Sequence, residues 1–232
     1  MEPIEVKYNK NLWLKLFDSY NSKLKMTNIG IYSITKPYVA LKFIIYIMMY
    51  AEDNKINLIN AIDATAGLGG ITRYLYKFTK NVISIEKNKL HFDICKFNMS
   101  IFEPDNKIKF INNNFIAIID SISNQDLIIC DPPWGGPSYK NKETNSLFLD
   151  DINVYIIINK LFNENKCKIF ALITMINYNF KDLENIDKNI CYNIFNVRNV
   201  LLICFSKKKY IYEVGYKNIC YNICEVEYQN II

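Results

Sequence analysis

The 232-residue sequence contains only one histidine, seven glycines and six prolines. Because His91 stands alone, a metal site built from several histidines is excluded, and His91 itself is assigned to packing or to the surface. The seven cysteines form no Cys-x-x-Cys pair and their number is odd, so no disulfide framework is predicted. Scattered thiols of this kind are typical of a reducing, intracellular compartment, and no metal is expected.

Long hydrophobic runs are also missing. Residues 39–51 are apolar, but Lys42 interrupts them, and they fall short of the ~18–20 residues that span a bilayer. We expect this segment to be a helix that covers a sheet, with no membrane partner and no N-terminal signal pattern. The formal charge of +5 permits an anionic partner such as RNA, and the length suits one globular domain.

Apolar segments of strand length alternate with segments of helical spacing along the chain. After predicted helices at 10–20 and 36–52, strands are predicted at 58–62, 82–85, 107–111, 127–130, 168–174, 198–206 and 214–226. The later predicted helices are 70–78, 88–101, 114–122, 150–163 and 180–189. This alternation indicates an α/β, Rossmann-like fold with a mostly parallel seven-stranded sheet covered on both faces. No helix separates the last two strands, so we expect an antiparallel C-terminal hairpin with its turn at 207–210.

The most informative segment is Asp131-Pro132-Pro133-Trp134-Gly135-Gly136-Pro137, which follows an apolar strand. Proline fixes φ and has no N–H, so the loop is stiff and its carbonyl groups stay outside the hydrogen-bond ladder of the sheet. Asp131 and the Pro132 carbonyl can accept hydrogen bonds from an exocyclic amine, while the Trp134 ring can stack on a flat base. This arrangement suits methyl transfer to the amino group of a nucleobase. The plainer alternatives are an Asp131 that caps a turn and a Trp134 that is wedged into the core.

A second motif, residues 63–70, is a glycine-rich turn between a predicted strand and a predicted helix. Glycines let the backbone approach a ligand closely, but alone such a turn also suits NAD, FAD, a phosphate or tight packing. S-adenosylmethionine is favoured because Glu86 ends the next strand, where its carboxylate can accept hydrogen bonds from both ribose hydroxyls. The plainer alternative is that Glu86 is a solvated charge at a strand end. Asp63 ends the first strand, within reach of the methionine ammonium. With Asp131, three acidic residues are therefore expected at one edge of the sheet.

These motifs resemble the methyltransferase domain of trimethylguanosine synthases, which methylate N2 of the 7-methylguanosine cap of RNA. Residues 63–70 match the family pattern Asp-Ala-x-x-Gly-x-Gly-Gly, and residues 132–139 match Pro-Pro-Trp-Gly-Gly-Pro-x-Tyr. Residues 16–20 and 30–37 echo two elements upstream. The resemblance implies a class I methyltransferase fold. It also implies an N-terminal helical extension, 1–52, that contributes to the cap pocket and precedes the methyltransferase domain, 53–232.

Three positions depart from the family pattern. Asp131 stands where the cap enzymes more often have Ser, and Asp is typical there of adenine-N6 and cytosine-N4 methyltransferases. Asn114 replaces the Asp that holds the adenine amine, although Asn can still accept from that amine. Of a Pro-Arg-Asn segment whose Arg reaches cap phosphates, only Asn177 remains. The substrate interpretation is therefore cap guanine N2, with adenine N6 or internal guanine N2 as the first alternative and a non-catalytic cap-binding protein as the second.

The resemblance implies a cofactor site and a cap site that share Asp131. The predicted residues for S-adenosylmethionine, and for its product S-adenosylhomocysteine, are Asp63, Thr65, Gly67, Gly69, Glu86, Asn114 and Asp131. The predicted catalytic residues are Asp131, Pro132 and Trp134, and the cap site adds Ser33, Thr35, Asn98, Tyr139 and Lys7. A cationic 7-methylguanine stacked on Trp134 gains about 0.5–2 kcal/mol, too little for strict cap specificity. We expect a monomer that acts on capped RNA in the nucleus or cytoplasm. If the enzyme is viral, this compartment is that of the host cell.

Overall fold

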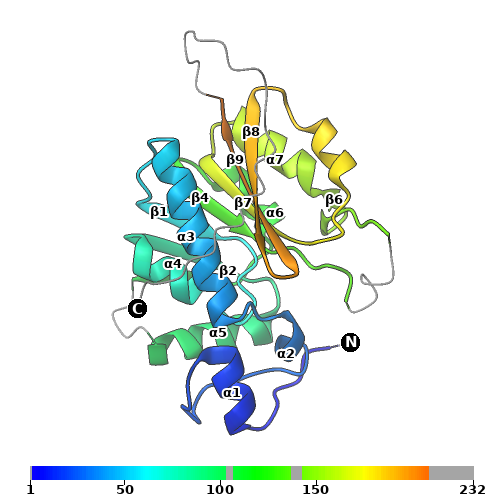
Figure 1. Ribbon diagram of the computed structural model, residues 1–232. Helices are drawn as coiled ribbons and strands as arrows, with labels where there is room; N and C mark the ends of the chain where they lie inside the picture. Colours follow the sequence, from blue (N-terminus) through cyan, green and yellow to red (C-terminus); the bar gives the residue numbers. More distant parts are fainter. Residues whose placement is uncertain (1, 103–106, 137–142, 209–232) are drawn as a thin grey trace, which may run out of the picture.

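The computed structural model describes residues 2–102, 107–136 and 143–208 of the chain. Its centre is a seven-stranded sheet with the strand order β3-β2-β1-β4-β7-β9-β8 (Figure 1). The strands are β1 (Asn60–Asp63), β2 (Asn81–Ile85), β3 (Ile108–Ile111), β4 (Gln125–Cys130), β7 (Cys167–Met175), β8 (Ile190–Val197) and β9 (Val200–Lys207). A separate two-stranded ribbon pairs β5 (Phe148–Leu149) with β6 (Ile152–Asn153). The predicted seven-stranded α/β sheet is confirmed.

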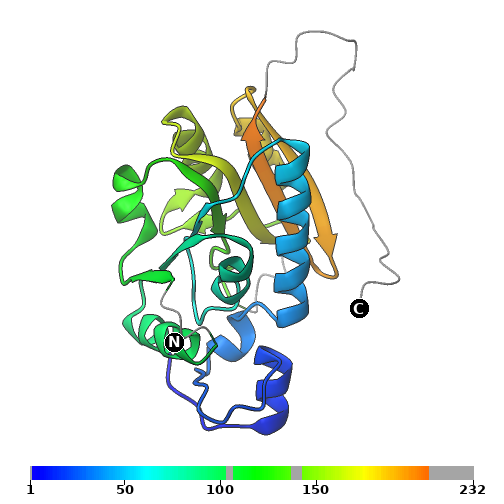
Figure 2. The same ribbon diagram turned by 90° about the vertical axis from the view of Figure 1, so that its left-hand side faces the viewer.

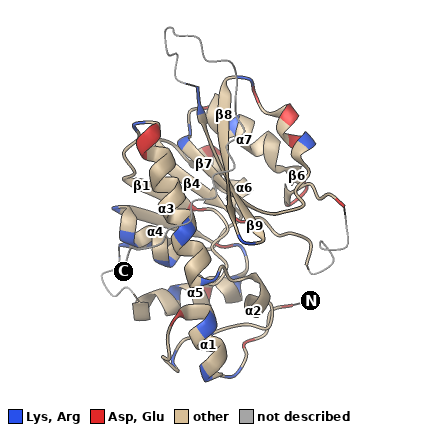
Figure 3. Cartoon of the chain, in the orientation of Figure 1, with Lys and Arg blue, Asp and Glu red and all other residues tan. Residues whose placement is uncertain are grey.

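Helices cover both faces of the sheet because successive residues of each strand point in opposite directions. On one face, α3 (Pro37–Asp53), α4 (Thr72–Phe78) and α5 (Lys89–Phe102) pack on strand residues such as Leu127 and Ile129. On the other face, α6 (Phe115–Ile118) and α7 (Val154–Asn163) pack on Ile128 and Cys130. Figure 2 shows α3 running along its side of the sheet, and Figure 3 shows that charged residues lie mainly on helices and connecting loops.

The antiparallel hairpin forms, but from other residues than the sequence predicted. It joins β8 to β9, and its turn falls at Arg198, where φ is 59°. β9 lies between β8 and β7 and pairs antiparallel with both. The turn expected at 207–210 is wrong because Lys207 still belongs to β9, and the strand expected at 214–226 lies outside the described residues.

The helix predicted at 180–189 was also wrong. Only a 3-10 segment, η3 (Phe180–Asn185), forms there, and β8 begins at Ile190. β8 is the edge strand of the sheet, and its residues alternate only weakly between buried and partly exposed positions. Such a strand lacks the continuous apolar run or the strict alternation by which strands are recognised in a sequence.

The N-terminal residues form a small apolar cluster beside the glycine-rich turn. The cluster contains residues of α1 (Lys10–Phe17) and of the four-residue helix α2 (Gly30–Ser33), together with Leu68 of the glycine-rich turn and Ile94 of α5. Trp13 is buried in this cluster, and its Nε1 donates a hydrogen bond to the Leu24 carbonyl oxygen at 2.7 Å. The division at residue 52 remains a prediction, while α3, which ends at Asp53, contributes to the main core.

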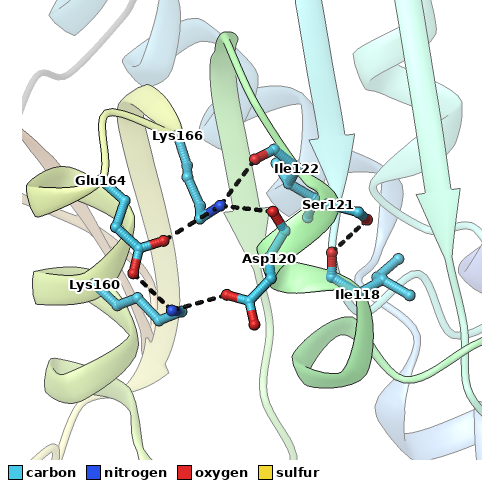
Figure 4. Close-up of polar contacts among 7 residues, drawn as sticks. All are labelled: Ile118, Asp120, Ser121, Ile122, Lys160, Glu164 and Lys166. Atoms are coloured by element: carbon cyan, nitrogen blue, oxygen red, sulfur yellow. Dashed lines mark hydrogen bonds and ion pairs between the residues drawn. The ribbon is translucent and has the colours of Figure 1, made fainter.

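At the amino ends of β4 and β7, a buried lysine holds two loops together (Figure 4). Lys166 Nζ donates to the carbonyl oxygens of Asp120 at 2.9 Å and Ile122 at 3.1 Å. Glu164 pairs with Lys166 at 3.3 Å and with Lys160 at 2.6 Å, and Lys160 also pairs with Asp120 at 2.8 Å. Asp120 and Glu164 are thus matched by lysines at this edge of the sheet.

No helix in the described ranges is both long enough and apolar enough to cross a bilayer. α3 contains the apolar segment singled out in the sequence, and it packs on the sheet as predicted. The described cysteines are unpaired thiols, at Cys95, Cys130, Cys167, Cys191 and Cys204.

Candidate active site

Three acidic residues lie where three neighbouring parallel strands end. Asp63 is the last residue of β1, Glu86 follows β2 and Asp131 follows β4. Asp63 is in register with Ser84 of β2 and Ile129 of β4, so these strand ends are level with one another. Glu86 and Asp131 line a pocket of about 250 Å³, and Asp63 is buried directly beside its wall. The structure thus brings the three residues together at one edge.

The glycine-rich turn and residues 33–35 form two walls of this pocket. They approach so closely that a Cβ on Gly70 would lie 2.8 Å from the Thr35 carbonyl oxygen. Gly67 and Gly69 have φ values of 54° and 90°, a conformation that favours glycine. Nothing lies within 4 Å of the place that a Cβ would take on Gly67, which lines the pocket. The turn therefore seals one side of the pocket and leaves free space on the other.

Asp63 is held by donors from the turn and from α4. Its carboxylate accepts hydrogen bonds from Thr72 Oγ1 at 2.7 Å and from the Thr65 backbone N at 3.3 Å. Burial raises the pKa of Asp63 to about 6, against the effect of these hydrogen bonds and with a further rise from the nearby Glu86. A cationic ligand group would relieve this unfavourable burial of negative charge.

Glu86 ties the strand end of β2 to the glycine-rich turn. One carboxylate oxygen accepts from the Gly67 backbone N at 2.8 Å and the other from the Asn88 backbone N at 2.7 Å. Burial raises the pKa of Glu86, and these two hydrogen bonds oppose the rise. Each oxygen has a second lone-pair site, so the carboxylate can accept from two hydroxyl groups while it keeps its backbone partners.

Asp131 joins β4 to the N-terminal wall of the pocket. Thr35 Oγ1 donates to its carboxylate at 3.2 Å, and its own backbone N donates to Thr65 Oγ1 at 2.7 Å. Burial raises the pKa of Asp131 to about 7; the Thr35 hydrogen bond opposes this rise, Asp63 adds to it and the Trp134 side chain opposes it. A carboxyl group that titrates near neutral pH is suited to accept a proton or a hydrogen bond from an amine.

Trp134 is partly buried and packs against both apolar clusters of the core. Its indole nitrogen is covered, and its side chain interacts with Asp131. Pro132 is buried, whereas Pro133 is exposed and lines the pocket. The structure therefore places Trp134 beside Asp131 but not on the wall of the pocket. Its partial burial is intermediate between the open stacking surface and the core residue that the sequence allowed.

Asn114, three residues after β3, lines the pocket, and its side chain is already engaged. Its Oδ1 accepts from the Ile116 backbone N at 2.9 Å and caps α6, and its Nδ2 donates to Asp150. The amide oxygen that the sequence assigned to the adenine amine thus serves as a helix cap.

The remaining predicted cap residues lie in different places. Ser33 and Thr35 line the pocket. Asn98 does not: it is fully buried, and its amide bonds both to the Lys25 backbone N and to the Lys25 carbonyl at 2.9 Å, which corrects its assignment to the cap. Lys7 is exposed and is not among the residues that line the pocket, and Tyr139 lies outside the described residues.

Three residues near the pocket were not assigned to it from the sequence. His91 lines the pocket from α5, and its Nε2 lies 3.0 Å from Thr27 Oγ1, so its packing role also shapes the site. Lys87 lines the pocket next to Glu86, and its Nζ pairs with Asp150 at 2.7 Å. Asp150 had no sequence signal, because its neighbours in the site come from positions 63 and 36 residues away.

The residues present fit S-adenosylmethionine in their order along the sheet edge. The strand order β3-β2-β1-β4 places Asn114, Glu86, Asp63 and Asp131 in a row. An adenine, a ribose, a cationic methionine and the methyl acceptor follow one another in the same order. Buried carboxylates suit the positive charge of the donor, and the open space at Gly67 suits a ligand that lies against the backbone.

This sheet order, with acidic strand ends around a glycine-rich turn, defines a class I methyltransferase fold. Solved structures agree with it. A proposed methyltransferase from Porphyromonas gingivalis superposes with a TM-score of 0.60 at 15% identity, over 84% of this chain and 47% of that chain. A proposed rRNA methylase from Clostridium thermocellum gives 0.51 at 11% identity, over 70% and 97%.

The family model described as RNA cap guanine-N2 methyltransferase matches residues 58–225, and the chain belongs to this family. Trimethylguanosine synthase of Schizosaccharomyces pombe is 30% identical over 154 residues, which are 64% of this chain and 61% of that protein. An uncharacterized protein of Acanthamoeba polyphaga mimivirus is 27% identical over 160 residues, 68% of this chain and 62% of that protein. The chain thus spans less than two thirds of these relatives.

Proposed function

We propose that the protein transfers a methyl group from S-adenosylmethionine to the exocyclic N2 amine of a 7-methylguanosine RNA cap, forming a hypermethylated cap. The observation that carries this proposal is Asp131, a carboxyl group with a raised pKa that follows β4 directly and opens the Pro-Pro-Trp loop. Family membership and the trimethylguanosine synthase relative support the same substrate.

The chemistry asks mainly for alignment and for hydrogen-bond acceptors. The N2 amine is neutral and weakly nucleophilic because its lone pair is delocalised into the purine. Asp131 and the Pro132 carbonyl accept hydrogen bonds from this amine and stabilise the positive charge that develops on nitrogen as the S–CH3 bond breaks. After the transfer, the extra N–H proton passes to the Asp131 carboxylate or to water. Since the donor methyl is already activated, positioning the amine at attack distance supplies much of the rate enhancement.

Trp134 is the proposed stacking partner of the cationic base. Its half-buried ring packs against two apolar clusters, which restricts the conformations that the side chain can adopt beside Asp131. A rigid ring needs little ordering when a base binds, and a cationic base adds about 0.5–2 kcal/mol over a neutral one. Ser33 and Thr35 complete the proposed cap pocket, and Lys7 and Tyr139 stay predictions.

The cap phosphates have a candidate partner that the sequence did not suggest. Arg198, at the tip of the β8–β9 hairpin, lies 4.7 Å from the centroid of the exposed Tyr38 ring. Val200 of this hairpin is in register with Met175, the last residue of β7, so the tip lies at the same edge of the sheet as Asp131. We propose that Arg198 contacts the phosphates, a role that the missing Arg after β7 leaves open.

Incubation with labelled S-adenosylmethionine tests the proposal. We expect label on 7-methyl-GDP and capped RNA, and mass spectrometry of the digested product gives the number of methyl groups on N2. Label that appears only on uncapped RNA or DNA would instead support the adenine-N6 or internal guanine-N2 alternative. Cap binding without any transfer would support a non-catalytic cap-binding protein.

We also propose that the protein works as a monomer in the nucleus or the cytoplasm, where capped RNA is found. Light scattering of the purified protein and fractionation of expressing cells test these two points.

A further inference from the structure

A small polar cluster occupies the rim of the pocket beyond Glu86. Lys87 and Asn114 both line the pocket, and Asp150, which is not among the lining residues, bridges them. Lys87 Nζ pairs with one carboxylate oxygen of Asp150 at 2.7 Å, and Asn114 Nδ2 donates to the other oxygen. The cluster therefore joins the ends of β2 and β3 to the β5–β6 ribbon.

Asn114 cannot turn its oxygen toward a ligand without losing its cap. The Oδ1 atom accepts from the Ile116 backbone N, which fixes the orientation of the amide and directs Nδ2 toward Asp150. Of the two side chains, Asp150 has the larger acceptor capacity at this rim, because each of its two carboxylate oxygens can accept a second hydrogen bond, whereas Asn114 has one oxygen whose direction is set by the cap.

Asp150 is also held in place by its own backbone. It sits in the tight connection between β5 and β6 with a φ of 53°, directly after Leu149, which is buried and lines the pocket. Hydrogen bonds from Lys87 and Asn114 lower its pKa, so the carboxylate is ionised at neutral pH. An ionised acceptor makes stronger hydrogen bonds than a neutral amide oxygen.

The strand order indicates which part of the methyl donor would lie next to Asp150. If the ribose lies on Glu86, at the end of β2, the purine of the methyl donor extends toward β3 and hence toward Asn114 and Asp150. We infer that Asp150 accepts a hydrogen bond from the exocyclic 6-amino group of adenine and thereby selects a 6-amino over a 6-oxo purine. This inference rests on the donor half of the proposed function and not on the cap.

The selection follows from the hydrogen-bonding pattern of the two purines. Adenine offers an N–H donor at position 6, which a carboxylate accepts. Hypoxanthine offers an oxygen there, so its binding would bring two acceptors together and leave both without a hydrogen. Lys87 and Asn114 prevent Asp150 from avoiding this contact by protonation or rotation.

Calorimetry with S-adenosylhomocysteine and its 6-oxo analogue, S-inosylhomocysteine, tests the inference. We expect the wild-type protein to bind the adenine compound at least about tenfold more tightly. Asp150→Asn should weaken this binding about tenfold and narrow the preference to within about threefold, because an amide can donate to a 6-oxo group. The matched control is Asp151→Asn, which removes the same charge from the next, exposed residue and should change neither value.

The outcomes separate the two proposals. Equal binding of both compounds by the wild-type protein would overturn the role of Asp150, and this measurement does not depend on whether a variant folds. An unchanged preference in Asp150→Asn would overturn it as well. Absence of any binding of S-adenosylhomocysteine to the wild-type protein would overturn the donor half of the proposed function together with this inference.

Discussion

Acidic residues lie at both ends of the parallel strands, but their surroundings differ. At the amino ends, Asp126 of β4 pairs with Lys168 at 2.7 Å and also accepts from the backbone N of Ile59 and Asn60, both at 2.9 Å. Burial raises the pKa of Asp126, but the hydrogen bonds outweigh it, and the pKa lies below its ordinary value. The fold therefore stabilises the ionised form of Asp126.

At the carboxyl ends, Asp63, Glu86 and Asp131 all have raised pKa values, chiefly because of burial. Within the described ranges none of the three forms an ion pair with a lysine or arginine. Within the described residues, the fold thus matches the buried Asp126 with a cation and leaves Asp63, Glu86 and Asp131 without one, although it pairs Asp150 at the pocket rim with Lys87. Unmatched negative charge at a pocket is typical of a site that binds a cationic ligand.

The largest expected effect is that of Asp131→Asn at the carboxyl edge. Loss of the ionisable acceptor should lower the rate of methyl transfer to 7-methyl-GDP about 10²–10³-fold, as for other single groups that stabilise developing charge. The affinity for S-adenosylhomocysteine should stay within a few-fold. Asp126→Asn, the same change at the amino edge, is the control and should leave the rate per folded molecule unchanged.

Trp134→Ala should weaken binding of 7-methyl-GTP about 10–100-fold, because stacking of a base on an aromatic ring is worth about 1–3 kcal/mol. Binding of S-adenosylhomocysteine, measured by calorimetry on the same sample, should change little. A parallel loss of both ligands would mean that Trp134 only supports the core.

Removal of the paired carboxylate at the amino edge should cost stability instead of binding. Asp126→Ala leaves two backbone N–H groups and Lys168 without their acceptor, which should lower the free energy of unfolding by about 1–3 kcal/mol. Urea unfolding gives this value. If Asp126→Ala left the free energy of unfolding unchanged, the structural role of Asp126 at the amino ends of the strands would be refuted.

The unmatched carboxylates should make stability depend on pH. The unfolded chain loses these protons near pH 4, whereas folded Asp63 and Asp131 keep them up to about 6 and about 7. The folded state thus binds more protons in this window, so the free energy of unfolding should fall as pH rises from about 4 to about 7. Asp63→Asn should flatten this fall by on the order of 1–3 kcal/mol and also weaken S-adenosylhomocysteine binding. Urea unfolding at several pH values tests the slope.

The smallest effect is expected at the hairpin tip. Arg198→Glu should weaken the binding of 7-methyl-GTP by less than about tenfold, because an exposed charge contributes about 1 kcal/mol or less. The binding of 7-methylguanosine, which has no phosphate, should not change. Lys188→Glu, near the start of β8 at the opposite edge, is the matched control. Equal loss for the nucleoside and the nucleotide would exclude a phosphate contact.

Most of the fold could be predicted because its signals are local. Apolar strands, glycine turns and the Pro-Pro loop lie within short segments, and the placement of Asp63 and Asp131 at one edge of the sheet follows from parallel pairing alone. The hairpin could not be placed correctly, since β8 is an edge strand whose mixed burial gives no clear period. Asn98 was misassigned because its partner, Lys25, lies 73 residues away.

The order of motifs along the chain determined the class of fold, the family and the three acidic strand ends, because each depends on spacing within a few residues and on the rule that parallel strands end at one edge. Tertiary structure alone decided that Asn114 caps a helix, that Asp150 stands at the pocket rim and that Trp134 rests partly in the core. These features arise from contacts between distant segments, and which hydrogen bonds a side chain makes there depends on what packing places beside it.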